Sequence, residues 1–537
     1  MQDPARTTRI LVGIIVFLTL VILSMVGVAL GIIVKVSKKQ DDVAAVTTTL
    51  SPPTANRLVA SITVDQMMSH LNALQRIADT TGGTRAIHTE GFHGTLDYIT
   101  QYLTNNTDLK VQRQDFNWST FDLISDPTFS SSISGTSKNY TWGVGKDFYQ
   151  LMYSGNSSTS STSARVTIVP NFGCNPSDWN VPNIDGTVAL VAAGGGCLYR
   201  IKTQLAPRNL GGLLIYNLGT PNNLFAVASS VNPNTTFPVI SVSHSVGMQL
   251  MNAANDTLTN TTVTIQLAAE KEERPVGNIC ADTRTGDPTQ TILIGGHSDS
   301  VPAGAGINDN GSGSAAIIVL ATNIARLFHN SVDQVYKYRV RFCWWGAEEV
   351  GLRGAEYHRD MARNTETVGE RISDYLVNLN YDMLASPNYM FGIYNGSSAP
   401  NNTPANAIPG SIRLTELFRD WFISQSLPWT YTDFSGRSDY GPFLETGIVA
   451  SGLFSGAEDR KSKIERDYYD RVLGSTLGGI AETAYDSCYH LSCDTVQNIN
   501  QFALQRMTQA AAYVLEYLGR LDNLQDWLYP KGRPETV

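Results

Sequence analysis

Two neighbouring segments in the middle of the chain carry side chains that could bind and orient a metal ion. His297 and Asp299 follow the apolar, β-branched run Thr291–Ile294, and Asp309 precedes the Ala/Ile/Leu-rich run Ser314–Phe328. The first run predicts a buried strand and the second a helix, which places these residues at the carboxyl edge of a sheet, where ligands of α/β proteins bind. A metal-bound imidazole usually donates its second N–H to a carboxylate, the role that we expect of Asp299. The alternative is a glycine-rich turn with a buried histidine and a capping aspartate.

Three further segments could supply the rest of a metal site. Glu348 with Glu349, and separately Asp382, follow strand-like runs, whereas His490 lies between two cysteines. Two adjacent carboxylates can point in different directions, one onto a metal and the other at water. Taken singly, the glutamates could complement a helix dipole, Asp382 could be a cap and His490 a surface histidine. Together, two histidines and three carboxylates, one of them bridging, form the ligand set expected for a pair of zinc ions or similar divalent metals.

The elements that would position these side chains alternate between strands and helices. Strand-like runs are Val276–Ala281, Thr291–Ile294, Arg339–Trp345, Tyr375–Tyr381, Asn388–Tyr394 and Ile448–Leu453. Helical patterns between or beyond them are Ser312–Phe328, Gly351–Asn364, Arg413–Ser424 and Asn500–Leu521. Two more helices, Val64–Asp79 and Glu90–Leu103, precede a strand at Leu109–Phe116. This alternation predicts an α/β domain with a mainly parallel sheet and helices on both faces.

The N-terminal part predicts a membrane anchor. Residues 10–34 are uncharged and mostly Ile, Leu, Val and Gly, which is long enough to cross a bilayer. A cleaved signal peptide is the alternative, because Gly27 and Ala29 resemble a cleavage site, but its apolar region is normally shorter. Residues 1–9 form a short tail, and residues 35–56, rich in Ala, Thr, Ser and Pro, predict a flexible stalk.

Composition limits the partners and indicates the compartment. The net charge of −9 provides no basic patch, so nucleic acid is not an expected partner. Among six cysteines we expect two local disulfides, Cys174 with Cys197 and Cys488 with Cys493. Cys280 and Cys343 lie in apolar strand-like runs, and we expect them to be buried thiols instead of a third bridge.

Glycosylation sequons are numerous after the apolar span. They lie at Asn105, Asn117, Asn139, Asn156, Asn234, Asn255, Asn260, Asn395 and Asn401. With the paired cysteines they favour a luminal or extracellular location for the folded part, in a vacuole or lysosome or at the cell surface. Cleavage of the N-terminal segment would instead give a secreted protein.

Residues 117–270 differ in texture from the rest, with short β-type runs and many Ser, Thr, Asn and Gly. We interpret them as an inserted β-rich domain. Gly186–Cys197, a helix near Arg200–Arg208 and Gly211–Tyr216 resemble a protease-associated domain, a type that acts as a lid or docking surface. An unrelated β-rich insertion is the alternative.

From Ser61 to Leu521 the chain resembles the M28 family of zinc aminopeptidases, especially the aminopeptidase Y group, which carries a protease-associated insertion. The matching motifs are His297–Val301, Gly306–Gly313, Ala347–Gly354, Asp382, Arg437–Phe443, Gly452–Glu458 and Cys488–His490. Tyr440 departs from the pattern, since many relatives have histidine after the Ser-Asp pair. The resemblance implies a zinc-peptidase α/β/α sandwich formed by residues 57–116 and 271–525, followed by a C-terminal tail, 526–537.

The resemblance also implies two metal-ligand shells that share one residue. Asp309 bridges two zinc ions, His297 and Asp382 complete one shell, and Glu349 and His490 complete the other. The implied activity is that of a dinuclear aminopeptidase, which binds peptides with a free N-terminus and releases single amino acids.

Four residues have implied roles other than metal binding. Glu348 is the general base, Asp299 orients a histidine ligand, Tyr489 donates a hydrogen bond to the tetrahedral oxyanion, and Arg437 helps to position substrate. A membrane-anchored carboxypeptidase and a non-catalytic receptor are alternatives with the same peptidase core, but both usually carry a further helical domain after it. A single-zinc glutaminyl-cyclase-like enzyme would lack the insertion.

Overall fold

The computed structural model describes residues 57–157, 162–195, 197–219, 224–227, 229–256, 258–330 and 335–534. They belong to one unit that starts at Asn56. The predicted tail, anchor and stalk at residues 1–9, 10–34 and 35–56 lie outside the described residues, as does the end of the predicted C-terminal tail.

An eight-stranded mixed sheet carries the candidate metal ligands. Its order is β1 (Lys110–Ser119), β12 (Glu273–Asp282), β14 (Tyr338–Trp345), β13 (Asp287–His297), β15 (Tyr375–Tyr381), β18 (Val449–Phe454), β16 (Gly392–Asn395) and β17 (Thr430–Asp433). The four strands β14, β13, β15 and β18 run parallel to one another, whereas β1, β12 and β16 pair with their inner neighbours in antiparallel fashion. The parallel core agrees with the predicted sheet, and the antiparallel strands make the complete sheet mixed.

Helices cover both faces of this sheet, as the alternation of side chains shows. Trp344 on β14 belongs to the core on the side of α7 (Gly313–Asn330), and its indole Nε1 donates to Ser314 O at 3.1 Å. The next residue, Trp345, packs on the opposite face against Phe443 in α10 (Tyr440–Glu445). Because successive strand residues point to opposite faces, both layers must be apolar, and every residue of β14 is buried.

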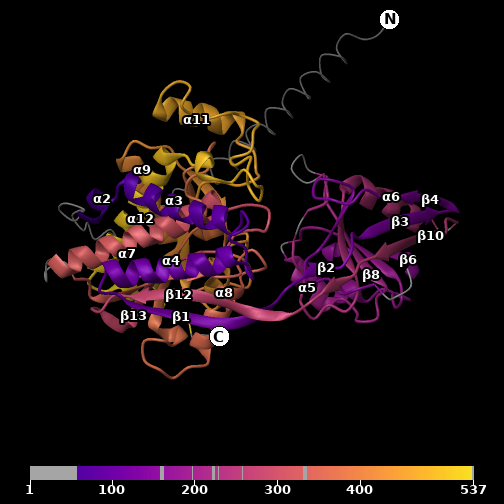
Figure 1. Cartoon of the computed structure of the whole chain (residues 1–537), viewed down its shortest axis with the longest axis horizontal. Helices are drawn as coiled ribbons and strands as arrows, with labels where there is room; N and C mark the ends of the chain where they lie inside the picture. Colours follow the sequence, from indigo (N-terminus) through magenta and orange to yellow (C-terminus); the bar gives the residue numbers. More distant parts are fainter. Residues whose placement is uncertain are drawn as a thin grey trace, which may run out of the picture. The chain divides into compact units, whose positions relative to one another are not determined.

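The helices α3, α4 and α7 lie on one side of β1 and β12 (Figure 1). The helices of this body, apart from α7 and α10, are α2 (Arg57–Ser61), α3 (Val64–Thr80), α4 (Glu90–Asn106), α8 (Arg353–Arg363), α9 (Ile408–Ser424), α11 (Lys463–Leu473), α12 (Gln501–Arg520) and α13 (Leu524–Leu528). Together with the parallel core, this arrangement gives the mixed α/β fold that the sequence predicts.

A second eight-stranded sheet forms from the segment between β1 and β12. Its order is β4 (Thr136–Asn139), β3 (Thr128–Ile133), β10 (Thr261–Gln266), β6 (Thr162–Ile168), β7 (Val188–Ala192), β8 (Gly212–Tyr216), β9 (Val239–Val242) and β5 (Phe148–Gln150). Helices α5 (Tyr199–Leu205) and α6 (His244–Asn255) and a small ribbon of β2 (Asp122–Leu123) with β11 (Ala269–Glu270) accompany it.

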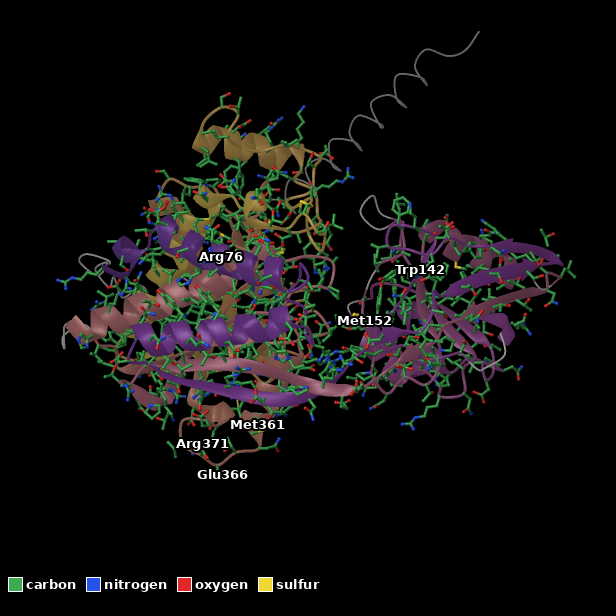
Figure 2. The ribbon with its side chains drawn as sticks, in the orientation of Figure 1. Arg76, Trp142, Met152, Met361, Glu366 and Arg371 are labelled. Atoms are coloured by element: carbon green, nitrogen blue, oxygen red, sulfur yellow. A yellow bond between two sulfur atoms is a disulfide. The ribbon has the colours of Figure 1, made fainter. Side chains whose placement is uncertain are left out.

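This second sheet has an apolar core of its own, which includes Phe129, Leu214 and Ile240. Trp142, labelled in Figure 2, donates through its indole Nε1 to Gln150 Oε1 at 2.7 Å within the same segment. The description of residues 117–270 as a protease-associated domain stays a prediction.

The disulfides correct one expectation. Both predicted bridges are present, but Cys280 and Cys343 also form a disulfide instead of remaining thiols. Cys280 on β12 lies directly opposite Cys343 on the antiparallel strand β14, with 4.2 Å between the two Cα atoms. Opposed residues of antiparallel strands point their side chains to the same face, so the register brings the two sulfurs together.

Among the described residues, one helical stretch is long and apolar enough to cross a membrane. This stretch, Ile307–His329, covers all but the last residue of α7, and 83% of its most apolar window is buried inside the protein. It is therefore a core helix of the α/β body.

Candidate metal centre

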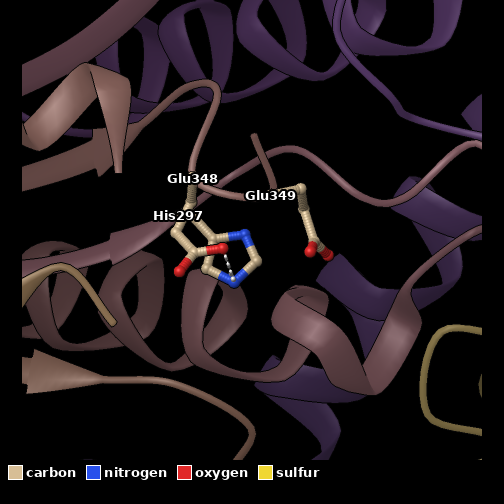
Figure 3. Close-up of side chains that lie close together, drawn as sticks. All are labelled: His297, Glu348 and Glu349. Carbon is tan, nitrogen blue, oxygen red and sulfur yellow. Dashed lines mark ion pairs between the residues drawn. The ribbon is translucent and has the colours of Figure 1, made fainter. Parts of the chain in front are cut away.

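Three parallel strands end side by side and bring the predicted ligands to one edge of the sheet. His297 is the last residue of β13 and is in register with Trp345, the last residue of β14. Glu348 follows β14 after a two-residue turn. Asp382 directly follows β15. Figure 3 shows His297, Glu348 and Glu349 close together, with the pair between His297 and Glu348 marked.

The first group of potential ligands is His297, Asp309 and Asp382. His297 Nε2 lies 3.3 Å from Asp309 Oδ1 and 3.5 Å from Asp382 Oδ1. All three side chains are buried. Two ligand atoms about 2.0–2.1 Å from one zinc ion in a tetrahedral site lie about 3.3 Å apart. The observed separations therefore suit a shared ion.

The second group is Asp309, Glu349 and His490. His490 Nε2 lies 3.0 Å from Asp309 Oδ2 and 3.0 Å from Glu349 Oε2. Asp309 thus turns one carboxylate oxygen to each histidine, as a bridging ligand would. The residues that the family resemblance assigns to two shells lie together in two groups, and a third group joins His297 to Glu348 and Glu349.

The donor atoms and the charges of the centre fit divalent cations. Glu349 Oε1 and Asp382 Oδ1 are buried and have no hydrogen-bond partner. Burial lowers the pKa of His297, but Glu348 and Asp382 outweigh it and raise this pKa well above its usual value. Burial likewise lowers the pKa of His490, and Glu349 and Asp309 raise it well above the usual value. A cluster that stabilises positive charge on two imidazoles provides the same electrostatic complement for metal ions.

Glu348 contacts this centre without belonging to either bridged group. Its Oε2 lies 3.9 Å from His297 Nε2, and the side chain is 10% exposed. Burial raises the pKa of Glu348 well above its usual value, with a further contribution from Asp439 and an opposing one from His297. A carboxyl group with a raised pKa is suited to accept a proton and return it near neutral pH.

Asp299 contacts both the histidine and the paired glutamates. Its carboxylate lies 3.6 Å from His297 Nδ1, and the same ring nitrogen is 3.1 Å from the backbone oxygen of Asp299. The carboxylate also accepts the backbone N–H groups of Glu348 at 3.1 Å and Glu349 at 3.3 Å. Asp299 therefore links the strand end of β13 to the turn that carries both glutamates.

A buried polar network that sequence reasoning missed holds the Asp309 loop against the His490 loop. Asp494 accepts the backbone N–H groups of Asn308 at 2.8 Å and Asp309 at 3.0 Å. Asn498 donates to both Asp486 and Asp494. Asn308 also donates to Asp486 at 2.6 Å. The only local signal was the position of Asp494 directly after Cys493.

A second missed residue is Arg85, which is completely buried and binds the loop between His297 and Asp309. Its guanidinium donates to the backbone oxygens of Ser298 at 2.5 Å, Ala305 at 2.8 Å and Gly306 at 2.6 Å. Burial lowers the pKa of Arg85 to about 10, so it remains a cation at neutral pH. It places one positive charge behind the carboxylates of the centre.

The metal edge opens into a cavity of about 470 Å³. Its lining includes apolar and aromatic side chains from Met383, Met390, Tyr394, Tyr440 and Phe454. Tyr440, the departure from the family pattern, is 1% exposed, and its hydroxyl accepts the backbone N–H of Gly436 at 2.9 Å.

Tyr489 and Arg437 lie in the same cavity, on the side of His490. The Tyr489 ring stacks on the His490 ring with 3.8 Å between their centroids. Arg437 donates to the Tyr489 hydroxyl at 3.2 Å. A smaller adjoining cavity of about 170 Å³ is lined by these residues together with Leu198–Arg200, Ser229 and Ser230 from the inserted segment.

Residues 278–515 match the family model described as peptidase family M28. The chain is 31% identical over 462 residues to a probable lipoprotein aminopeptidase of Mycobacterium tuberculosis, covering 84% of each protein. It is 32% identical to an aminopeptidase of Pseudomonas aeruginosa, covering 84% of this chain and 80% of that protein. A probable leucine aminopeptidase 2 of Trichophyton verrucosum is 32% identical, with 86% of each protein covered. The chain belongs to peptidase family M28. The predicted family and enzyme class, a hydrolase of peptide bonds, are thereby confirmed.

Solved structures share the fold at lower identity. An aminopeptidase from Aneurinibacillus sp. strain AM-1 superposes with a TM-score of 0.62 at 19% identity, covering 90% of this chain and 98% of that one. A zinc aminopeptidase from Bacillus subtilis gives a TM-score of 0.52 at 18% identity, covering 85% of this chain and 95% of that one.

Proposed function

We propose that this M28 peptidase is a zinc aminopeptidase with two zinc ions, which removes single amino acids from the free N-terminus of peptides. The observation that carries the proposal is Asp309, whose two carboxylate oxygens each face a different histidine. His297 and Asp382 would hold one ion and Glu349 and His490 the other. The sequence relatives that are aminopeptidases, and the similarly folded zinc aminopeptidase from Bacillus subtilis, support the same activity.

The bound ions would supply Lewis acidity for the scissile carbonyl and lower the pKa of water. Glu348 removes the proton from the attacking water and later donates it to the departing amine, which its buried, unshared carboxyl group allows. Tyr489, in the same cavity, donates its O–H to the oxygen on which negative charge develops. Arg437 is the candidate for positioning substrate on this side.

The cavity supports a preference for a large apolar first residue. Met383, Met390 and Phe454 form an apolar surface within the cavity that also contains both metal groups. Burial of a leucine-sized side chain contributes about 1.5–3 kcal/mol, which is enough to rank substrates. The relative named leucine aminopeptidase supports this choice.

The inserted segment fits the role of a protease-associated domain beside the site. Arg200 pairs with Glu356 in α8 of the peptidase body, and Ser230 Oγ donates to Val350 O at 3.3 Å. Residues of this segment line the smaller cavity next to Glu348 and His490. We assign it a lid-like function that limits access to the centre.

The folded part is assigned to a luminal or extracellular compartment, attached to the membrane by residues 10–34. Three disulfides support an oxidising environment. Most of the sequon asparagines are exposed, but the Asn156 side chain donates to Ala269 O and accepts its N–H, so a glycan on Nδ2 would have to fit beside both hydrogen bonds. Asn395 is half-buried.

Release of free amino acids from unblocked, N-acetylated and C-amidated peptides by the purified chain tests the activity. Activity that is lost on N-acetylation and on chelation, but kept on C-amidation, is the expected result. Sensitivity to C-amidation would indicate the alternative carboxypeptidase. Absence of chelator-sensitive release from any peptide would favour the receptor.

A further inference from the structure

Arg437 lies between two partners in the lining of the metal cavity. One nitrogen, Nη1, donates to Glu458 Oε1 at 2.8 Å, and the other, Nη2, donates to the Tyr489 hydroxyl at 3.2 Å. The Arg437 and Glu458 side chains are 55% and 43% exposed. An exposed ion pair of this kind contributes little to stability. The contact that bears on the site is therefore the one between Arg437 and Tyr489.

The direction of the hydrogen bond to Tyr489 has a chemical consequence. A guanidinium has only N–H donors, so the Tyr489 oxygen must be the acceptor in this contact. The phenolic hydrogen then remains available for a second partner. Since Tyr489 lines the cavity that contains Glu348 and both metal groups, that partner can be the substrate oxygen.

The contact also fixes and polarises the phenol. The ring of Tyr489 stacks on the ring of His490, which restricts how the Tyr489 side chain can rotate. Arg437 binds the phenol oxygen at the other end of the Tyr489 ring. A neighbouring positive charge strengthens the hydrogen bond that the O–H donates to an anionic oxygen. Glu458 in turn holds the guanidinium in place through the opposite nitrogen.

We propose that Arg437, held by Glu458, is a positioning residue that directs the O–H of Tyr489 toward the oxyanion of the transition state, instead of binding the peptide directly. This inference rests on the proposed aminopeptidase function. It assigns to Arg437 an effect on kcat, which direct binding of the peptide in both ground and transition states would not produce.

A double-mutant cycle distinguishes these roles. Tyr489→Phe is expected to lower kcat about 10²–10³-fold, as for loss of one oxyanion donor. Arg437→Gln is expected to lower kcat about tenfold with little change in KM, since the donor remains but is no longer directed. In the Tyr489→Phe background, Arg437→Gln should have no further effect on kcat. Arg437→Lys should recover part of the loss, and Glu458→Gln should produce a smaller loss of the same kind.

Arg113→Gln is the matched control. Arg113 lies on β1, outside the cavity lining, and forms an exposed ion pair with Asp97 at 2.7 Å. It should leave kcat and KM unchanged. Equal losses from Arg437→Gln in both backgrounds, or a raised KM with unchanged kcat, would overturn the proposal and identify Arg437 as a direct peptide ligand.

A readout without turnover separates this inference from the proposed function. A fluorinated tyrosine at position 489 should show a changed fluorine NMR resonance in the Arg437→Gln and Glu458→Gln proteins, and the Arg113→Gln protein should show none. An unchanged resonance in the first two would refute the contact. If the unmodified enzyme with zinc released no amino acid, the proposed function would fail, while the NMR result would still decide whether Arg437 holds the phenol.

Discussion

The two halves of the proposed metal centre have similar candidate ligands but differ in how the protein holds them. His297 is the last residue of a central strand, and its side chain is 1% exposed. His490 lies in a short loop closed by the disulfide between Cys488 and Cys493, and its side chain is 33% exposed. Asp309 belongs to both halves.

The supports of the two halves differ in the same way. The His297 half is fixed by the register of β13, β14 and β15 and by Arg85 behind the loop. The His490 half depends on Asp494, which connects its loop to the backbone of Asp309. One half is thus part of the core, and the other is a loop attached to it. We expect the ion on the His490 side to exchange more readily.

Loss of Asp309, the ligand that both halves share, should affect the two halves equally. Asp309→Asn takes the charged bridging oxygen from both halves, so both ions should be weakened together and amino-acid release should fall to background. Metal content after dialysis, measured by mass spectrometry, tests this expectation. Retention of one firmly bound ion would mean that Asp309 serves only one half.

Glu348→Gln should leave both halves intact while stopping the chemistry. The carboxyl group belongs to neither bridged group, so metal content should match that of the unmodified protein. Loss of the general base is expected to lower kcat about 10²–10⁴-fold. Near-normal turnover in this variant would remove Glu348 from the role.

Asp494→Asn should weaken the His490 half more than the His297 half, because Asp494 lies at the end of the His490 loop, whereas Asp309, whose backbone it holds, belongs to both halves. The variant weakens two backbone hydrogen bonds that join the loops, and comparable changes around metal ligands lower affinity about 10–100-fold. Zinc titration by calorimetry should show one site weakened more than the other. Asp522→Asn is the control, because Asp522 forms an exposed ion pair with Lys337. Equal weakening of both sites would contradict the separate support of the His490 half.

Arg85→Lys should affect the His297 half, mainly by lowering the stability of the folded protein. A lysine cannot reach three carbonyl oxygens in a planar fork, and each buried acceptor left without a donor costs about 1–3 kcal/mol. The melting temperature should fall, whereas Arg419→Lys at an exposed pair should leave it unchanged. A melting temperature equal to that of the control would mean that the loop does not depend on Arg85.

The smallest expected effect is that zinc binding reverses how the stability of the folded protein depends on pH. The pKa values of His297 and His490 are raised in the folded protein, so in metal-free protein their contribution is complete below the unfolded value of 6.5 and is lost as pH rises through the folded values. Zinc requires neutral imidazoles, so its stabilisation should increase with pH. Melting temperatures of the metal-free and zinc-bound forms, measured at pH values on either side of the unfolded pKa, test this reversal. A parallel pH dependence of the two forms would contradict it.

Three side chains of the proposed centre could be placed from the sequence because each lies at or just after the end of a strand with a clear apolar pattern. The central parts of β13, β14 and β15 are buried and largely apolar; β14 and β15 end where the sequence places them, whereas β13 continues three residues beyond Ile294 to His297. His297, Glu348 and Asp382 follow from those ends.

The remaining contacts depend on register and on distant segments. The bridge between Cys280 and Cys343 requires knowledge that β12 pairs with β14 in one register. Arg85 contacts carbonyl oxygens more than two hundred positions later in the chain, and no side-chain pattern marks a carbonyl as an acceptor. β17, with half-exposed and exposed residues in alternation, lacks the apolar signal of a central strand.

The zinc content of the purified enzyme tests the proposed two-ion centre most directly. The chain, saturated with zinc and then dialysed against metal-free buffer, should retain two zinc ions per molecule by mass spectrometry, and His490→Ala should retain one. A single ion in the unmodified enzyme, unaffected by His490→Ala, would contradict the two-ion centre.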